Sequence, residues 1–89
     1  MSTAADSVIF ADVRLTLVDT LGLSTPLRLL NAQTPLLGAM PELDSMGVVL
    51  LLTALEDRFD LVLSDDDIDS AWFETLGSLT EAIEARLPQ

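Results

Sequence analysis

The stretch at residues 43–59 reads LDSMGVVLLLTALEDRF and opens with Leu43-Asp44-Ser45-Met46. An Asp-Ser step before an apolar segment predicts the start of a helix, because both side chains can accept hydrogen bonds from the unpaired N–H groups of a first turn. We therefore expect a helix from Ser45 to Phe59. Taken alone, the Asp-Ser pair most often serves only as a cap and gives Ser45 no further role.

This predicted helix is apolar on two faces. We assign one group to the inward face: Met46, Val49, Leu52, Thr53 and Phe59. The other apolar residues cannot all be buried as well in so small a domain: Val48, Leu50, Leu51 and Leu55. A helix that is apolar nearly all round is normally buried or meets a partner, so we expect part of this surface to contact another protein.

An earlier helix is predicted over residues 7–21. Its apolar residues recur at helical spacing and define one face: Phe10, Val13, Leu17 and Leu21. Gly22 follows directly and is a candidate for the left-handed residue that ends a helix.

Residues 23–43 are predicted to form a long connection, because three prolines and Gly38 interrupt any long helix. We expect one short turn at residues 26–30. A loop of this length is uncommon and usually has a function or packing of its own. We expect apolar anchors to hold it across the bundle: Leu29, Leu30, Leu36, Leu37, Met40 and Leu43.

Two more helices are expected in the C-terminal part. The first is short, begins at Ser64 with Asp67 in a capping-box position, and turns Ile68, Ala71 and Trp72 inward. The last follows a Thr75 cap, ends at Pro88 and has apolar residues at helical spacing: Leu76, Leu79, Ile83 and Leu87. Trp72 and Phe73 are expected in the core. The sequence thus predicts one all-α domain, with three main helices, one short helix and a long first loop.

The composition excludes several function classes. The 89 residues contain 15 acids and four arginines, no histidine, lysine or cysteine, and a net charge of −11. Such a chain should repel nucleic acid and anionic membranes and attract basic partners. It cannot assemble a catalytic triad or a thiolate metal site, so we expect it not to be an enzyme. We find no secretory signal and no run long enough to span a bilayer, and expect a soluble, cytoplasmic protein.

The acidic string Asp65-x-Asp67-x-Asp69 suggests a calcium loop at first sight. An EF-hand loop needs Gly next and Glu at its twelfth position, but the sequence has Ser70 and Leu76 there. We therefore expect no metal site and interpret the string as a solvated helix start.

Several motifs together resemble a known family. They are residues 43–46, Val49, Ala54-Leu55-Glu56-x-x-Phe59, Leu21-Gly22-Leu23 and Phe73-Glu74-Thr75-Leu76-Gly77-Ser78-Leu79. In an acidic chain of this length and helix pattern, they resemble the acyl carrier protein family over nearly the whole sequence.

The resemblance implies an acyl-carrier-like four-helix bundle that catalyses nothing itself. Ser45 would bear a 4′-phosphopantetheine arm from coenzyme A, whose thiol carries acyl groups as thioesters in fatty acid or polyketide biosynthesis. Asp44 would help a phosphopantetheinyl transferase to engage the site, besides capping the helix, and Met46 would pack beneath the root of the arm. A phosphodiester on Ser45 would lie against free N–H groups at the positive end of the helix dipole.

One departure from the family's pattern concerns partners. Many members carry acids along the exposed face of this helix, but here Gly47 and Leu50 occupy positions where acids would be expected. Charge remains only at the ends, on Glu42, Asp44, Glu56 and Asp57. Our hypothesis is that partners dock mainly through apolar contacts, with charge at the rim.

The branch of the family is suggested by residues 34–46, which resemble stand-alone carriers found beside adenylating acyl ligases in bacterial exosortase-associated gene clusters. We expect a free-standing monomer whose partners are a phosphopantetheinyl transferase and an adenylating acyl ligase, an acyltransferase or a synthase. Two alternatives stay open. One is a peptidyl or aminoacyl carrier; the other is a non-enzymatic helical interaction module in which Ser45 is only a cap.

Overall fold

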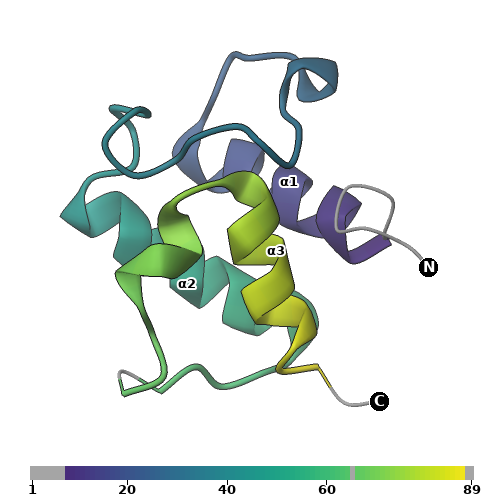
Figure 1. Ribbon diagram of the computed structural model, residues 1–89, viewed down its shortest axis with the longest axis vertical. Helices are drawn as coiled ribbons and strands as arrows, with labels where there is room; N and C mark the ends of the chain where they lie inside the picture. Colours follow the sequence, from purple (N-terminus) through teal and green to yellow (C-terminus); the bar gives the residue numbers. More distant parts are fainter. Residues whose placement is uncertain (1–7, 65, 88–89) are drawn as a thin grey trace.

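The computed structural model describes residues 8–64 and 66–87, which form three α-helices and two short 3-10 helices (Figure 1). The α-helices are α1 (Val8–Leu21), α2 (Ser45–Phe59) and α3 (Leu76–Glu84); the 3-10 helices are η2 (Leu27–Leu29) and η3 (Ser70–Phe73). The all-α class and the bounds of α2 are therefore confirmed. Within this part of the chain, no helix is long and apolar enough to cross a membrane.

Helix α1 lies against both α2 and α3, and the long connection between α1 and α2 runs over one end of the bundle (Figure 1). The predicted inward face of α1 is confirmed, since Phe10, Val13 and Leu17 are buried and Leu21 is half-buried. The completely enclosed side chains come from all three helices and the connection: Val13, Leu17, Leu36, Leu51, Leu55, Leu76, Leu79, Thr80 and Ile83.

The end of α1 is set by Gly22, as predicted. Gly22 has φ of +63°, a left-handed conformation that costs glycine little. The Leu23 N–H then donates to the Val18 carbonyl at 3.1 Å, which is the hydrogen bond of a Schellman motif. The chain leaves α1 in a fixed direction and enters the connection.

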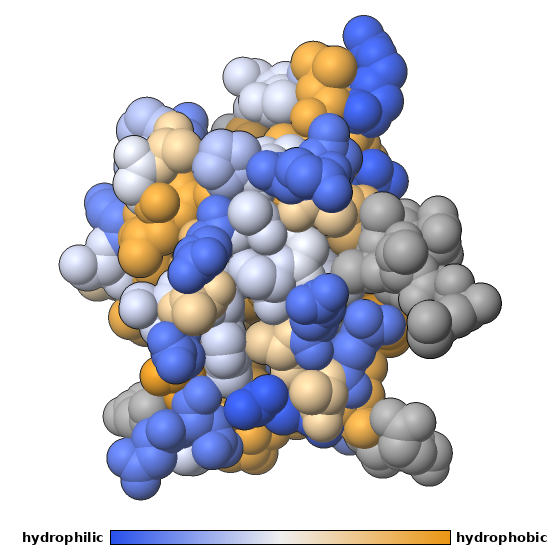
Figure 2. Space-filling model, in the orientation of Figure 1, coloured by the Kyte–Doolittle hydropathy of each residue, from blue (hydrophilic) through white to orange (hydrophobic). Residues whose placement is uncertain are grey.

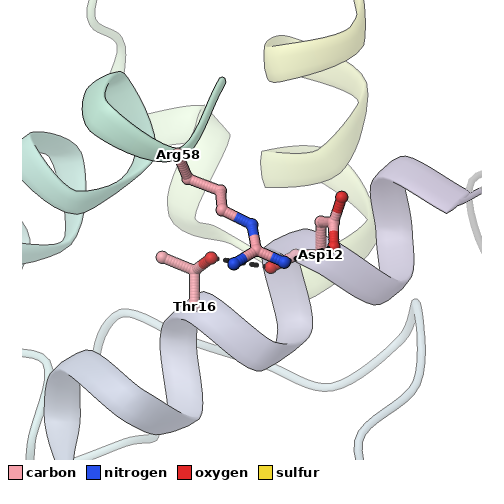
Figure 3. Close-up of polar contacts among 3 residues, drawn as sticks. All are labelled: Asp12, Thr16 and Arg58. Atoms are coloured by element: carbon pink, nitrogen blue, oxygen red, sulfur yellow. Dashed lines mark hydrogen bonds and ion pairs between the residues drawn. The ribbon is translucent and has the colours of Figure 1, made fainter. Parts of the chain in front are cut away.

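An ion pair links the far end of α2 to α1. Arg58 Nη2 donates to Asp12 Oδ1 at 2.8 Å, one turn from Thr16, whose hydroxyl donates to the Asp12 carbonyl (Figure 3). Both charged side chains are partly exposed, so the pair contributes about 0.2–1 kcal/mol at most.

The predicted inward face of α2 is wrong for Met46, Val49 and Thr53. Gly47, Leu51 and Leu55 are buried, whereas Met46 and Val49 are 64% and 56% exposed. Thr53 is also exposed, but Leu52 and Phe59 are half-buried and pack against the core as predicted. Because leucine and valine occupy both faces, hydrophobic periodicity cannot choose between them. The rotation of α2 is instead fixed by Gly47, the position at which the backbone of the preceding loop approaches the helix most closely.

The predicted short helix from Ser64 is also wrong. The Asp67 N–H donates to the Ser64 carbonyl in a simple turn, and the 3-10 helix starts only at Ser70, capped by Asp69. Consecutive aspartates favour turns and caps over a helix interior, which explains the late start. Trp72 and Phe73 are buried as predicted, but Ala71 is exposed.

The last helix is shorter than predicted. Thr75 caps it in a full capping box with Ser78, but α3 ends at Glu84. The Arg86 and Leu87 N–H groups donate to carbonyls three residues back, which tightens the last turn. Leu87 is half-buried, and Pro88 lies outside the described residues.

The anchors of the long connection are partly confirmed. Leu30, Leu36 and Leu43 are buried, and Met40 is half-buried. Leu29 and Leu37 are not anchors, because they are 59% and 47% exposed. Alternate residues of an extended segment point to opposite sides, so not every leucine here can face the bundle.

Candidate functional site

Backbone carbonyls of the long connection accept hydrogen bonds from N–H groups at the start of α3. The Leu76 and Gly77 N–H groups donate to the carbonyls of Thr34 and Ala32, both at 2.9 Å. The Ser78 N–H donates to Thr75 Oγ1 at 3.1 Å. The N–H groups that a helix start usually leaves unpaired are therefore satisfied within the fold. No anion is needed at this end of α3.

Hydrogen bonds also fix the path of the connection as it approaches α2. The Leu36 and Leu37 N–H groups donate to Glu74 and Phe73 carbonyls, at 3.1 and 2.9 Å. Two further turns follow, in which Met40 N–H donates to the Leu36 carbonyl and Leu43 N–H to the Met40 carbonyl. Since Leu36 and Leu43 are buried, both ends of residues 36–43 are held by the core.

The start of α2 differs from that of α3 because it remains open. Asp44 is the N-cap, and its Oδ1 accepts a hydrogen bond from the Gly47 N–H at 2.8 Å. Within the described part of the chain, the N–H groups of Ser45 and Met46 and the Ser45 hydroxyl have no hydrogen-bond partner. Ser45 is exposed. A helix start with free N–H groups is an environment that favours phosphate.

Gly47 is one of the residues of the site that sequence reasoning placed wrongly. It was expected on the exposed face, in place of an acid, but it is buried. A Cβ here would lie 2.5 Å from the Glu42 carbonyl oxygen and 3.3 Å from Leu21 Cδ2. The loop and the end of α1 can approach α2 only because position 47 has no side chain. The signal was a glycine inside an otherwise apolar helix, which usually has a packing reason.

The cap and the charge of Asp44 can be separated by two substitutions. We expect Asp44→Ala to lower the free energy of unfolding by about 1 kcal/mol, because the Gly47 N–H loses its acceptor. The free energy of unfolding of Asp44→Asn should stay close to that of the parent protein, since asparagine caps as well as aspartate. Urea unfolding of the three proteins checks this, and equal loss in both variants would contradict a role as a cap.

The outer face of α2 beside Ser45 is apolar. Met46, Val49 and Leu50 are 64%, 56% and 49% exposed, and we call these three residues the α2 patch. Figure 2 shows apolar surface at the left edge of the molecule, where the connection meets α2 in Figure 1. An apolar surface is thus present on α2; Leu50 is exposed as expected, whereas Met46 and Val49 replace residues that were expected there. Met46 belongs to it instead of to the core.

Charges flank the α2 patch unevenly. Glu42 and Asp44 are exposed at the Ser45 end. At the other end Glu56 is already engaged, because its Oε2 accepts a hydrogen bond from the Leu63 N–H at 2.8 Å. Asp57 is exposed at that end, so acids lie at both ends of the patch, two of them beside Ser45.

The acidic string near residue 67 shows no metal-binding arrangement. Asp69 Oδ1 accepts from the Ala71 N–H at 2.9 Å and caps η3, while Asp65 lies outside the described residues. Over residues 8–64 and 66–87, no three acidic side chains are grouped to hold a metal ion.

Comparison with known proteins shows the family to which this chain belongs. The chain is similar to a holo acyl carrier protein from Nitrosomonas europaea, solved in solution by NMR. The two share 46% sequence identity with a TM-score of 0.80, over 89% of this chain and 95% of the other. This chain belongs to the acyl carrier protein family, whose members are carriers and not enzymes. No protein-family model and no curated protein matches the sequence.

The residues at the start of α2 fit a phosphodiester-linked arm. The Ser45 hydroxyl is exposed and unengaged, two N–H groups beside it are free, and Gly47 lets the Glu42 backbone lie close against α2. By contrast, Ser70 follows Asp69 in the same Asp-Ser order but begins a four-residue 3-10 helix, whose dipole is much weaker.

Proposed function

We propose that residues 1–89 form one carrier domain that bears 4′-phosphopantetheine on Ser45 and moves thioester-bound acyl groups between enzymes. The observation that carries this proposal is the open start of α2, with an exposed serine at its first position. In loading, the Ser45 oxygen bonds to the phosphorus of coenzyme A that carries pantetheine. The pyrophosphate bond breaks, adenosine bisphosphate leaves, and the hydroxyl proton passes to a base of the transferase.

The arm supplies the chemistry that the chain lacks. With no cysteine in its 89 residues, the protein has no thiol for a thioester. The residues of this chain would only hold the arm: Ser45 would attach it, and the free Ser45 and Met46 N–H groups would be available to its phosphodiester. Such an anion at a helix start is stabilised by about 0.3–1 kcal/mol at an exposed site.

Loading by a broad-specificity phosphopantetheinyl transferase tests the proposal. After incubation with coenzyme A, whole-protein mass spectrometry should show the gain of one phosphopantetheine, and Ser45→Ala should show none. Ser70→Ala is the matched control, because Ser70 also follows an aspartate cap and is exposed. If the parent protein gains no mass, the chain is an interaction module and the proposal fails.

Asp44 is proposed to contact the transferase through its carboxylate. The Asp44→Asn variant keeps the cap and removes the charge, so its loading rate reports the carboxylate alone. A slower rate with unchanged unfolding supports the contact, and an unchanged rate limits Asp44 to capping.

We propose that the α2 patch docks the enzymes that load and unload the arm, such as an adenylating acyl ligase. The support is its position directly beside Ser45, with an apolar centre and acids at the near rim. A complementary partner would have an apolar surface flanked by basic side chains.

Leu50 is the member of the α2 patch that tests docking most sharply. We expect Leu50→Asp to slow transfer of the acyl group to or from the partner by about tenfold, which corresponds to about 1.4 kcal/mol. Val62→Asp is the control, because Val62 is 88% exposed and lies outside the patch. Equal transfer rates for Leu50→Asp and the parent protein would exclude the patch as the docking surface.

A further inference from the structure

Met46 has the most exposed side chain of the α2 patch. It is 64% exposed, against 56% for Val49 and 49% for Leu50. Residues three and four positions apart are neighbours on the surface of a helix, so these three side chains form one continuous surface. Met46 lies at the end of that surface that adjoins Ser45.

The direction of helix side chains brings the thioether of Met46 to the start of α2. In an α-helix the Cα–Cβ bonds tilt toward the N-terminus, and a long side chain covers the turn that precedes its own Cα. For Met46 that turn is the open start of the helix, with the Ser45 hydroxyl and the N–H groups of Ser45 and Met46 described above. A chemical change at the sulfur therefore occurs beside the proposed attachment point.

The other sulfur atoms of the chain differ from that of Met46 in their surroundings. The 89 residues include no cysteine and three methionines, which are Met1, Met40 and Met46. Met40 is half-buried and packs against the core, whereas Met1 lies outside the described residues. Because oxidation of a thioether depends on its exposure to the oxidant, we expect Met46 to react before Met40.

Oxidation would change the chemistry of the α2 patch. Methionine sulfoxide is polar, and its sulfinyl oxygen accepts hydrogen bonds. This oxygen would introduce a polar group into an apolar surface that loses its water when a partner docks. It would also compete with the phosphodiester for the N–H groups at the start of α2, since both are acceptors.

The fold does not depend on the Met46 side chain. The inward face of α2 consists of Gly47, Leu51 and Leu55, and the cap is the carboxylate of Asp44. Changes at the surface away from such contacts usually alter stability little. Oxidation of Met46 should therefore act on binding at the α2 patch and leave the folded state intact.

We propose that Met46 is an oxidation site, and that its sulfoxide slows the attachment of phosphopantetheine at Ser45 until the thioether is restored. This inference rests on the proposed attachment at Ser45. The oxidant is a peroxide. One oxygen of hydrogen peroxide bonds to the sulfur, which gives up two electrons; the O–O bond breaks, and the other oxygen leaves as water with both protons. A methionine sulfoxide reductase reverses the change, because two thiols supply two electrons, form a disulfide and release the oxygen as water.

Peroxide treatment followed by loading tests the inference. The full chain is treated with hydrogen peroxide for increasing times, the peroxide is removed, and peptide mass spectrometry gives the fraction oxidised at each methionine. Met46 should oxidise about fivefold faster than Met40. Each sample is then incubated with coenzyme A and a broad-specificity phosphopantetheinyl transferase. The loading rate of molecules with the Met46 sulfoxide should fall by about tenfold, and methionine sulfoxide reductases should restore it.

Two variants separate Met46 from the other methionines. Met46→Leu keeps an apolar side chain that cannot be oxidised, so peroxide should not change the loading rate of this variant. Met40→Leu is the matched control, and its loading rate should fall on treatment as much as that of the parent protein. The urea midpoint of the treated parent protein should not move, since the effect is local to the start of α2.

The results that would overturn the role of Met46 differ from those that would overturn the proposed function. Equal loading rates for the thioether and the sulfoxide overturn the role of Met46 alone. The same holds for oxidation of Met46 no faster than that of Met40, for an equal effect of peroxide on Met46→Leu and the parent protein, and for a lower urea midpoint after treatment. If the untreated protein gains no phosphopantetheine, the proposed function and this inference fail together.

Discussion

Gly47→Ala is expected to destabilise the protein, although alanine is the better helix former. In an exposed helix the change would gain about 1 kcal/mol. Here the new Cβ would stand 2.5 Å from the Glu42 backbone oxygen, which cannot rotate away as a side chain can. Relieving such overpacking typically costs about 1–3 kcal/mol. We expect a net loss in the free energy of unfolding, measured by urea denaturation.

The Gly47→Ala substitution should also disturb the start of α2, beside Ser45. The Glu42 carbonyl and Asp44 Oδ1 both lie within 3.3 Å of the added methyl group, so residues 42–44 must shift and the cap weakens. Thr53→Ala is the control for helix propensity, because it places alanine on the exposed face of α2, away from the close approach of the Glu42 backbone. A Gly47→Ala variant as stable as the parent protein would show that the loop does not need this close approach.

Leu51→Ala is expected to have the largest effect on stability. Leu51 is fully buried on the inward face of α2, and removing such a side chain costs about 2–5 kcal/mol through lost burial and the cavity left behind. A small domain has about 5–15 kcal/mol of stability in all, so the variant should be close to unfolding. Thermal unfolding measures the loss, at roughly 4–8 °C per kcal/mol for a chain of this size.

Leu50→Ala is the matched control for Leu51→Ala. The two leucines are neighbours in sequence, but Leu50 is 49% exposed, so its truncation should change stability by no more than about 0.5 kcal/mol. If both variants lose the same stability, the rotation of α2 described above is wrong.

Much of the fold follows from local signals in the sequence. The caps at Asp44 and Thr75 and the left-handed Gly22 are correct because each depends on a few neighbouring residues. The bounds of α2 are correct for the same reason. The predicted face of α1 is correct, although Val8 and Leu15 are apolar and exposed outside it.

The wrong predictions concern features that depend on contacts between residues far apart in the sequence. Which side of α2 faces inward depends on the approach of residue 42 to Gly47, and apolar spacing carries no such information. The residues of the long connection that face the bundle are selected by hydrogen bonds to residues 73–77. The exposed position of Ser45 at the start of α2 could be predicted, but the surfaces around it could not.

The central claim is that Ser45 carries the arm. Fragmentation mass spectrometry of the transferase-treated protein tests it most directly, because it assigns the added mass to one residue. We predict that every loaded molecule carries phosphopantetheine on Ser45. Phosphopantetheine on any other hydroxyl, such as that of Ser70, or a protein that stays unmodified, would contradict the claim.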